Sequence, residues 1–437
     1  MPGFTSNSVA VLGVPFNNVT MDEAVRIIEE KIESGGYHQV ATANVDFLMH
    51  AIHDPELQNI LCSCALVVPD GMPILWSARL MGSRLKERVC GIDLVPRLAE
   101  LAARRGYSIF LLGASDKSSQ RAAEILQERY PGLRIAGRYS PPVRPIAQMN
   151  HEEILARIEM AQPDILLVAF GNPKQEKWLS MHRDRLRVPV SIGIGGSLDM
   201  IAGQLARAPK WMQKSGLEWF FRAAQEPRRL AGRYLTDALT LGRYLPQQMA
   251  ATASQPRVSG PSRIMSAELG DTVVISIQGN LTGQSLNEFE TQARDAAEAS
   301  KHIVLDMSES GYFGPNTLGS LVQLMASMQR RKLQFWLAGM RPHLVRLLRS
   351  ARLDSCFRIT SNVADALYRI AKAEQAVTGH MPALQSLRRK AGPAVQMRLE
   401  AMQNVCQKMA VSGQAMPLDF GQGLNHASRY GFKVSVG

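Results

Sequence analysis

Short apolar runs alternate with helix-length amphipathic runs between residues 8 and 200. Many of the apolar runs are continuous and end at Gly, Asp or Asn, which is typical of strands that are covered on both faces. The pattern therefore predicts an α/β fold with a mostly parallel sheet and covering helices. Its strands are expected at residues 9–14, 39–42, 66–68, 108–112, 133–136, 165–169 and 190–194.

A second α/β unit is predicted beyond a segment of small and polar residues, punctuated by Pro and Gly, at 250–265. This segment has the composition of a linker. It separates a first domain, 1–249, from a smaller domain, 266–375, and a basic, partly disordered tail is expected at 376–437. The second domain is expected to have strands at 273–277, 303–306 and 334–338, and helices at 285–298, 316–329, 342–351 and 362–373.

Polar side chains follow several predicted strands, and ligands of open parallel sheets bind beyond the carboxyl ends of the strands. Asp70 comes directly after an apolar strand and precedes Gly71. A carboxylate at this place can act as the general base that deprotonates a substrate hydroxyl. It can equally cap the helix that begins near Met72 and Pro73. The residue pattern leaves both roles open, and Asp199 poses the same choice.

Gly113 and Gly195 each stand between a predicted strand and a helix. Glycine permits close backbone approach, and the N–H groups of the helix start favour a phosphate, although an ordinary glycine-capped turn has the same sequence. Arg88 could clamp a diphosphate with its guanidinium or form a surface salt bridge. The His residues lack zinc-site spacing and no Asp-x-Asp occurs, so neither a metal nor another cofactor is expected.

Lys and Arg number 50 against 38 Asp and Glu, which gives a formal net charge of +12. Residues 207–243 and 380–437 hold most of this excess, so the charge predicts local surfaces for anionic partners. Nucleic acid is not expected as a partner, because the chain shows no recognised nucleic-acid-binding module. The 5 Cys residues, and the lack of a signal peptide or spanning segment, predict a cytoplasmic protein.

Nine collinear motifs between about residues 9 and 245 resemble those of the WecG/TagA/CpsF glycosyltransferases, glycosyltransferase family 26. The family resemblance implies a Rossmann-like sheet in the first domain. The motifs are Gly13-Val-Pro-Phe, Thr42-Ala-Asn44-Val-Asp46, Pro69-Asp70-Gly71-Met-Pro-Ile-Leu-Trp76, Arg88-Val-Cys-Gly-Ile-Asp93, Phe110-Leu-Leu-Gly113, Gly171-Asn-Pro-Lys-Gln175-Glu176, Gly195-Gly-Ser-Leu-Asp199, Arg207-Ala-Pro209, and Gly216-Leu-Glu-Trp219-Phe-Phe-Arg222 with Glu226-Pro-Arg228-Arg229.

The resemblance implies a hexosyltransferase for exopolysaccharide or cell-surface polysaccharide biosynthesis. Such an enzyme inverts the anomeric centre, needs no metal, and moves an N-acetylhexosamine, hexose or hexuronic acid. The donor is a UDP-sugar and the acceptor a polyprenyl-diphosphate-linked saccharide, at the inner face of the cytoplasmic membrane. The residues implied are Asp70 as the base, Thr42 and Asn44 in the sugar and acceptor pocket, Arg88 and Gln175 on donor or acceptor, Asp199 in the nucleotide region, and Arg222, Arg228 and Arg229 in a membrane-docking appendage, 216–249.

The segment 216–245 also has an interpretation of its own. Trp219, Phe220 and Phe221 stand beside several Arg residues. Aromatic rings at headgroup depth with cations on anionic lipid are typical of an interfacial helix. A terminal helix that packs on the core and exposes a basic face would show the same residues.

The second domain, 266–375, is similar to STAS domains, the fold of anti-sigma factor antagonists. That family usually has Asp-Ser at the start of a helix, where Ser is phosphorylated, and here the aligned residues are Gly314 and Pro315, followed by Asn316 and Thr317. Thr317 could accept phosphate or cap the helix. The domain is therefore interpreted as a module for a protein partner or for regulation. An alternative function for the chain is a sugar-nucleotide sensor that signals through this domain.

Overall fold

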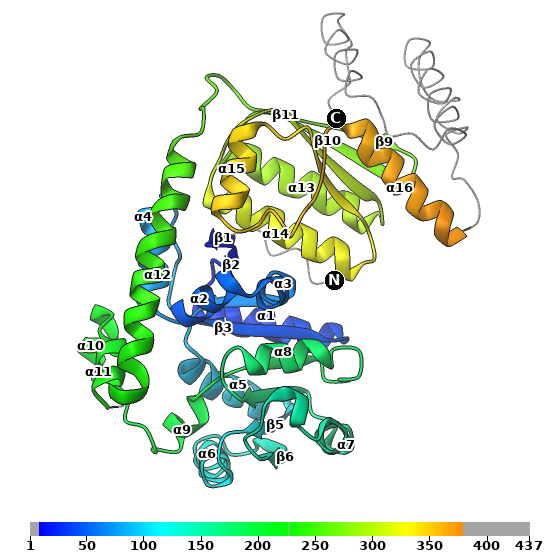
Figure 1. Ribbon diagram of the computed structural model, residues 1–437. Coiled ribbons are helices and arrows are strands. Elements are labelled where there is room, and N and C mark those ends of the chain that lie inside the picture. The colour runs from blue at the N-terminus through cyan, green and yellow to red at the C-terminus, as the bar shows by residue number, and fades with distance from the viewer. Residues whose placement is uncertain (1–7, 226, 379–437) are drawn as a thin grey trace, which may run out of the picture.

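The computed structural model describes residues 8–225 and 227–378. Its first part is built on a six-stranded sheet in the order β4-β3-β8-β7-β5-β6, in which all neighbours are parallel (Figure 1). The predicted fold class is confirmed, and six of the seven expected strands are present. They are β3 (His38–Ala43), β4 (Leu66–Pro69), β5 (Ser108–Gly113), β6 (Arg134–Tyr139), β7 (Ile165–Ala169) and β8 (Val190–Gly193).

Helices cover both faces of this sheet, which explains why its strands are continuously apolar. One hydrophobic cluster joins the strands to helices α1, α5 and α6, and a second joins them to α7 and α8. Helix α1 begins after a capping box of Thr20 and Glu23. The helices of this part are α1 (Met21–Ser34), α2 (Val45–His53), α3 (Pro55–Ser63), α4 (Met72–Leu80), α5 (Gly91–Arg105), α6 (Asp116–Arg129), α7 (His151–Ala161), α8 (Lys174–Met181) and α9 (Ser197–Ile201).

The expected single strand at 9–14 is wrong. The segment forms an antiparallel hairpin of β1 (Ser8–Val11) and β2 (Val14–Asn17). Leu12 and Gly13 both have positive φ, 46° and 83°, as the two central residues of a tight hairpin turn require. Both strands of the hairpin are fully buried, so its apolar pattern is the same as that of a central strand.

The second part is a five-stranded sheet in the order β13-β12-β11-β10-β9, and it contains every strand and helix expected there. Two further strands were not predicted, because β9 is mostly exposed and β13 has only three residues. The elements are β9 (Arg263–Leu269), β10 (Thr272–Leu281), α13 (Gln284–Glu298), β11 (His302–Phe313), α14 (Pro315–Arg330), β12 (Phe335–Ala338), α15 (Pro342–Ser350), β13 (Arg358–Thr360) and α16 (Val363–Thr378).

The two parts share a tightly packed interface that we call the seam: the hairpin β1–β2 and helix α3 on one side, and helix α14 with residues 351–352 on the other. The backbone of Ser8 lies so close to Gly319 of α14 that a Cβ atom there would be 2.5 Å from the Ser8 carbonyl carbon. Ala10 and Cys62 belong to the hydrophobic core of the second part. Ser83 Oγ also lies 2.5 Å from Asn316 Oδ1. The second part is therefore packed against the first and not merely tethered to it.

Neither role suggested for Thr317 fits the structure. Its side chain is fully buried, and its hydroxyl donates a hydrogen bond of 2.5 Å to the carbonyl of Leu281. Helix α14 has Gly314 as its N-cap, without a side-chain capping bond. Thr317 thus anchors the helix to β10, and its hydroxyl is closed to a phosphate donor.

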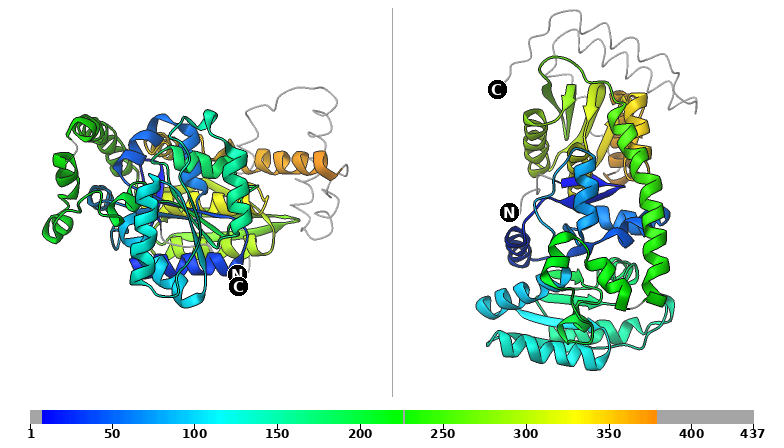
Figure 2. Two further views of the ribbon diagram at one scale, coloured as in Figure 1. Left: turned by 90° about the horizontal axis from the view of Figure 1, so that it is seen from below. Right: turned by 90° about the vertical axis from the view of Figure 1, so that its left-hand side faces the viewer.

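Three helices connect the parts: α10 (Lys210–Ser215), α11 (Glu218–Gln225) and α12 (Pro227–Ala253). Helix α12 runs beside α2 of the first part and reaches α15 of the second (Figures 1 and 2). At its far end the Gln248 side chain accepts from Leu12 N at 2.9 Å and donates to the Ala10 carbonyl at 3.2 Å. The expected linker, 250–265, is therefore shorter, since its first residues belong to α12 and its last to β9.

Helix α12 is the longest of these, yet none of the described helices combines the length and the apolar character that a membrane crossing needs. Of the expected tail, 376–437, the first three residues end helix α16, and the others lie outside the described residues.

Candidate active site

The strand ends of β3, β4, β7 and β8 meet at one edge of the first sheet, and hydrogen bonds join their loops. The hydroxyl of Thr42, 4% exposed, donates to the Gly193 carbonyl of the neighbouring strand at 3.0 Å. The backbone N–H of Asp70 donates to the Ala43 carbonyl at 2.9 Å. This register sets Asn44 and Asp70 side by side, just beyond the ends of β3 and β4. Asn44 itself caps α2 by accepting from Phe47 N at 3.3 Å.

The structure excludes one of the two roles left open for Asp70. Helix α4 has Gly71 as its N-cap and no side-chain capping bond, so Asp70 is not a cap. Its partly exposed carboxyl accepts a hydrogen bond from the Cys90 thiol and faces the cations Arg88 and Arg222. Because the Asp70 carboxylate makes no capping hydrogen bond to a helix, it is available for proton transfer.

The groups around Asp70 shift the pKa of its carboxyl in opposite directions. Burial is the largest influence and raises the pKa of its carboxyl, with the negative charge of Glu218 adding to the rise. The Cys90 hydrogen bond and the positive charges of Arg222 and Arg88 lower the pKa, but the net shift is upward. A carboxylate with a raised pKa is a stronger base than an ordinary Asp, as general-base catalysis near neutral pH requires.

Arg88 lies in a buried network of charges and does not form the surface salt bridge considered from the sequence. Its guanidinium donates to Glu218 of α11 at 2.5 Å, and both side chains are only 15% exposed. Arg207 forms a two-pronged pair with Asp93, at 2.6 Å for each bond, and its Nε lies 3.8 Å from Glu218. Two guanidiniums thus converge on Glu218, and that of Arg88 also acts on the charge of Asp70.

Gln175 is placed to hold the loops of the site. Its side chain is 1% exposed, and its Oε1 accepts from the backbone N–H groups of Gly171 and Gly195, both at 3.1 Å. It therefore fixes the loops after β7 and β8 relative to each other. Asp46 joins a third segment, because it accepts from Asn172 at 3.1 Å and lies 3.7 Å from Arg233 of α12.

The remaining predicted site residues have fewer contacts with the residues around Asp70 and Gln175. Gly113 has φ 96°, and a Cβ there would lie 2.8 Å from the Ala169 carbonyl, so glycine is needed where β5 packs on β7. Asp199 is partly exposed in the first turn of α9. Arg222 reaches the β8 loop, with its Nη2 3.8 Å from the Cβ position of Gly196. Arg228 is exposed at the start of α12, and the side chain of Arg229 lies outside the described residues.

Several site residues received no role from sequence reasoning. Cys90, Asp93, Arg207 and Glu218 all lie inside the quoted motifs, but only packing shows that they meet. One feature of the sequence could have indicated these residues: they occur in three separate motifs, and each of these motifs contains an Arg. Among the described residues, no group of three or more His, Cys, Asp and Glu could hold a metal ion.

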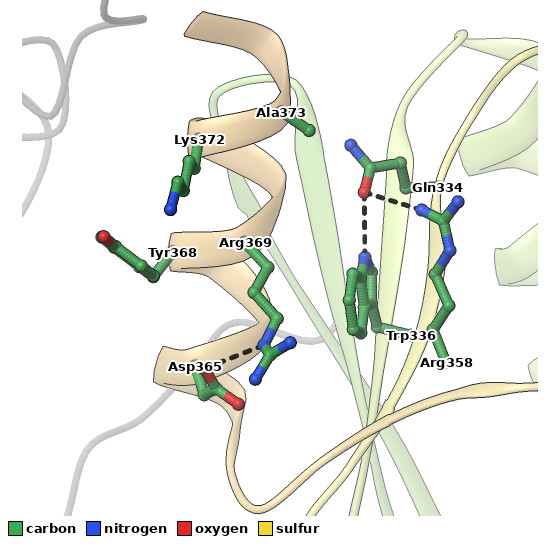
Figure 3. A pocket seen from close by; sticks show the side chains of 8 residues that line it. All are labelled: Gln334, Trp336, Arg358, Asp365, Tyr368, Arg369, Lys372 and Ala373. Carbon is green, nitrogen blue, oxygen red and sulfur yellow. Dashed lines mark hydrogen bonds and ion pairs between the residues drawn. The ribbon is translucent and has the colours of Figure 1, made fainter. Parts of the chain in front are cut away.

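Two hollows stand out on the described surface. One, of about 940 Å³, adjoins the site and is lined by Arg88 and Arg207. The other, of about 710 Å³, lies between β12, β13 and α16 of the second part (Figure 3). There the Gln334 side chain accepts from both Trp336 and Arg358 at 3.1 Å, and Arg369 pairs with Asp365 at 3.1 Å. This second hollow is remote from the strand ends of the first sheet, and two of its four charged side chains, Arg369 and Asp365, pair with each other.

Glu176, beside Gln175, allows a prediction about stability. Burial raises the pKa of its carboxyl to about 8, from an ordinary 4.5. The unfolded chain loses this proton near pH 4.5 and the folded chain only near pH 8, so stability falls as pH rises through this window. Glu176→Gln should therefore have a Tm gain over wild type that grows from pH 4.5 to 8 in thermal melts. The exposed Glu159→Gln is the control, and a gain independent of pH would contradict the prediction.

Comparison with known proteins identifies the families of the two parts of the chain. Residues 9–254 match the model of the glycosyl transferase WecG/TagA/CpsF family. The chain belongs to this family of glycosyltransferases. Residues 263–366 match the STAS domain, so the chain joins a transferase domain to a STAS domain.

Two similar relatives are both named N-acetylglucosaminyldiphosphoundecaprenol N-acetyl-beta-D-mannosaminyltransferase. The one from Bacillus subtilis is 31% identical over 49% of this chain and 83% of its own length. The one from Staphylococcus aureus is 30% identical over 51% of this chain and 86% of its own length. A crystal structure of an anti-sigma factor antagonist from Mycobacterium paratuberculosis matches 26% of this chain and 97% of that chain, at 18% identity and a TM-score of 0.24.

Proposed function

We propose that this protein transfers a sugar, with inversion, from a UDP-sugar to a polyprenyl-diphosphate-linked saccharide in the synthesis of a cell-surface or exported polysaccharide. The observation that carries the proposal is the Asp70 carboxyl at the open sheet edge, with a raised pKa and two arginines beside it. The names of the relatives support the acceptor class, since both describe transfer to a sugar on undecaprenyl diphosphate.

The proposed reaction is a single displacement. Asp70 takes the proton of the acceptor hydroxyl as its oxygen forms a bond to the anomeric carbon of the donor sugar. The bond from that carbon to the diphosphate breaks on the opposite face, and UDP leaves with the electron pair. Arg88 and Arg222 stabilise the negative charge that develops on the diphosphate. These side chains supply the positive charge that a metal ion would otherwise provide.

The test is a donor screen on the full-length protein. A panel of UDP-sugars is incubated with a short lipid-diphosphate-linked saccharide, and UDP release is followed with and without EDTA. We expect release with one class of UDP-sugar, at a rate that EDTA does not change. A protein that binds UDP-sugars but releases no UDP with any acceptor would instead support the sugar-nucleotide sensor.

We further propose that helices α10 and α11 dock on the cytoplasmic face of the membrane. Trp211, Trp219 and Phe220 are 64%, 43% and 57% exposed, which is unusual for such large side chains unless they meet a partner. Aromatic side chains of this kind lie at headgroup depth, and exposed Lys210 of α10 would meet anionic lipid. The alternative of a core-packing helix does not explain these exposed rings.

Replacing these three aromatic residues together with Ser should abolish most binding to vesicles that contain anionic lipid, because their apolar area no longer enters the bilayer. Vesicle flotation measures the bound fraction. The matched control is Val143→Ser, which removes an exposed apolar side chain outside these helices. Equal flotation of the triple variant and wild type would rule out docking through α10 and α11.

A further inference from the structure

We infer that Cys62 of α3 and Cys356, in the turn between α15 and β13, form a reversible disulfide when hydrogen peroxide oxidises them, and that this bond covalently joins the STAS domain to the transferase domain. The two residues are far apart in the sequence and meet at the seam. The inference concerns how the domains are held together, and it does not depend on which sugar is transferred.

Cys62 lies on the transferase side of the seam and is closed to solvent. Its side chain is 2% exposed, and its Sγ lies 3.5 Å from the carbonyl oxygen of Gly13 in the hairpin turn. Although α3 belongs to the transferase domain, Cys62 is part of the hydrophobic core of the STAS domain. Its thiol therefore lies where the two domains are packed together.

Cys356 reaches the same helix from the STAS side. Its Sγ lies 3.7 Å from Oδ1 of Asn59, which precedes Cys62 by about one turn of α3. Residues three apart share a helix face, so Cys356 lies on the face that carries Cys62. Cys356 packs against the hydrophobic cluster that contains Cys62, and a hydrogen bond joins the two thiols. A disulfide therefore needs only a short further approach of the two sulfur atoms.

The backbone around this pair is held by contacts across the seam. Gln58, one turn before Cys62 on α3, donates a hydrogen bond to the carbonyl of Arg352. A Cβ atom at Gly13 would lie only 2.8 Å from the carbonyl oxygen of Ala351. Because a disulfide tolerates little variation in the positions of its two residues, such contacts favour the pair as a site for one.

The two thiols differ in the way that a peroxide-sensitive pair requires. Cys356 is partly exposed, and the hydrogen bond from Cys62 lowers the pKa of its thiol. Ser355 adds to this fall, whereas burial and the negative charge of Asp354 oppose it. The hydrogen bond with Cys356, together with burial, raises the pKa of Cys62. Since the thiolate is the reactive form, Cys356 is the residue that peroxide oxidises first.

The oxidation proceeds in two steps. The Cys356 thiolate attacks one oxygen of hydrogen peroxide, the O–O bond breaks, and the hydroxide that leaves takes up a proton to become water. Cys356 is then a sulfenic acid. The sulfur of Cys62 attacks the Cys356 sulfur, and the S–H proton of Cys62 leaves with the hydroxyl group as a second water. Two thiols are thus oxidised and one peroxide is reduced, and a dithiol restores both thiols by exchange.

The first experiment counts the thiols of the full-length protein. Reduced protein is treated with hydrogen peroxide, denatured in N-ethylmaleimide and measured by mass spectrometry. The number of labelled thiols should fall from five to three. A digest without reductant should contain the peptides of Cys62 and Cys356 joined to each other. Cys356→Ser should lose no thiol, whereas the matched control Cys64→Ser, which removes another partly exposed thiol of the same segment, should still form the bond.

The second experiment identifies the residue that reacts first. In Cys62→Ala, the sulfenic acid has no thiol to react with, and dimedone should trap it at Cys356. A dimedone adduct at another Cys, or a disulfide in wild type that uses another Cys, would overturn the inference. So would oxidation of these thiols by peroxide without any disulfide.

Thermal melts test whether the bond joins the domains. The oxidised wild type should have a higher Tm than the reduced protein, because the bond restricts the unfolded chain. Dithiothreitol should abolish the difference, and peroxide should not raise the Tm of Cys356→Ser. An unchanged Tm after complete formation of the disulfide would show that the bond does not hold the seam together.

Discussion

Asp70→Asn is expected to lower kcat for sugar transfer by about 100- to 10,000-fold, the usual contribution of a general base. Asn has the same shape but cannot take the acceptor proton. Binding of the UDP-sugar should survive, since Arg88 and Arg222 remain. UDP release measures the rate and calorimetry the binding. Asp116→Asn, at an exposed position on α6, is the matched control.

The pH profile of the wild type adds a second readout. The base must be deprotonated, and burial raises the pKa of Asp70. The value of kcat/KM should therefore rise with pH through a midpoint above that of an ordinary Asp. The Asp70→Asn variant should lack this dependence. Near-normal turnover in the variant, or an acidic limb that persists in it, would remove Asp70 from the mechanism.

Gly319→Ala should destabilise the protein by about 1–3 kcal/mol, as overpacking does. The added Cβ would lie 2.5 Å from the Ser8 carbonyl carbon and 2.9 Å from Val9 N, and these backbone atoms cannot rotate away as a side chain could. Thermal melts and urea titration measure the loss. The expected result is one cooperative transition at a lower Tm, because the seam joins both parts of the chain.

Gly232→Ala provides a matched control for this substitution. Gly232 is also inside a helix, α12, but a Cβ there would meet nothing within 4 Å. Alanine is the better helix former, so the control should stabilise the protein by up to ~1 kcal/mol. If Gly319→Ala were as stable as its control, the close approach at the seam would be wrong.

The periodicity of the sequence predicts the central sheet well, because strands buried on both faces leave an apolar run that few other elements share. It fails at the hairpin of β1 and β2, where burial comes from a partner more than 300 positions away in the sequence, helix α14. Local pattern could not distinguish this case from a central strand. The edge strand β9 was missed for the opposite reason, since its exposed side chains are mostly polar.

The candidate site, too, could be predicted only in part from the sequence. Residues just beyond a strand, such as Asp70, can be located from the sequence, because strand ends share one edge of the sheet. Whether Asp70 caps a helix depends on backbone geometry at Gly71, which the sequence does not reveal. Gln175 was predicted to contact substrate, whereas the structure gives its Oε1 two backbone partners. The meeting of Glu218 with Arg88, 130 positions apart, depends on how α11 folds back.

The seam also sets an order of events during synthesis. Domains usually fold in turn as the ribosome releases them. Here β1 and β2 are covered by α14, a helix synthesised far later, and Gln58 hydrogen-bonds a residue 294 positions downstream, Arg352. Until the STAS domain has been synthesised, the apolar side chains of the hairpin β1–β2 in the nascent transferase domain remain exposed to solvent. A ribosome stalled before residue 315 would thus hold a chain that chaperones recognise as unfinished.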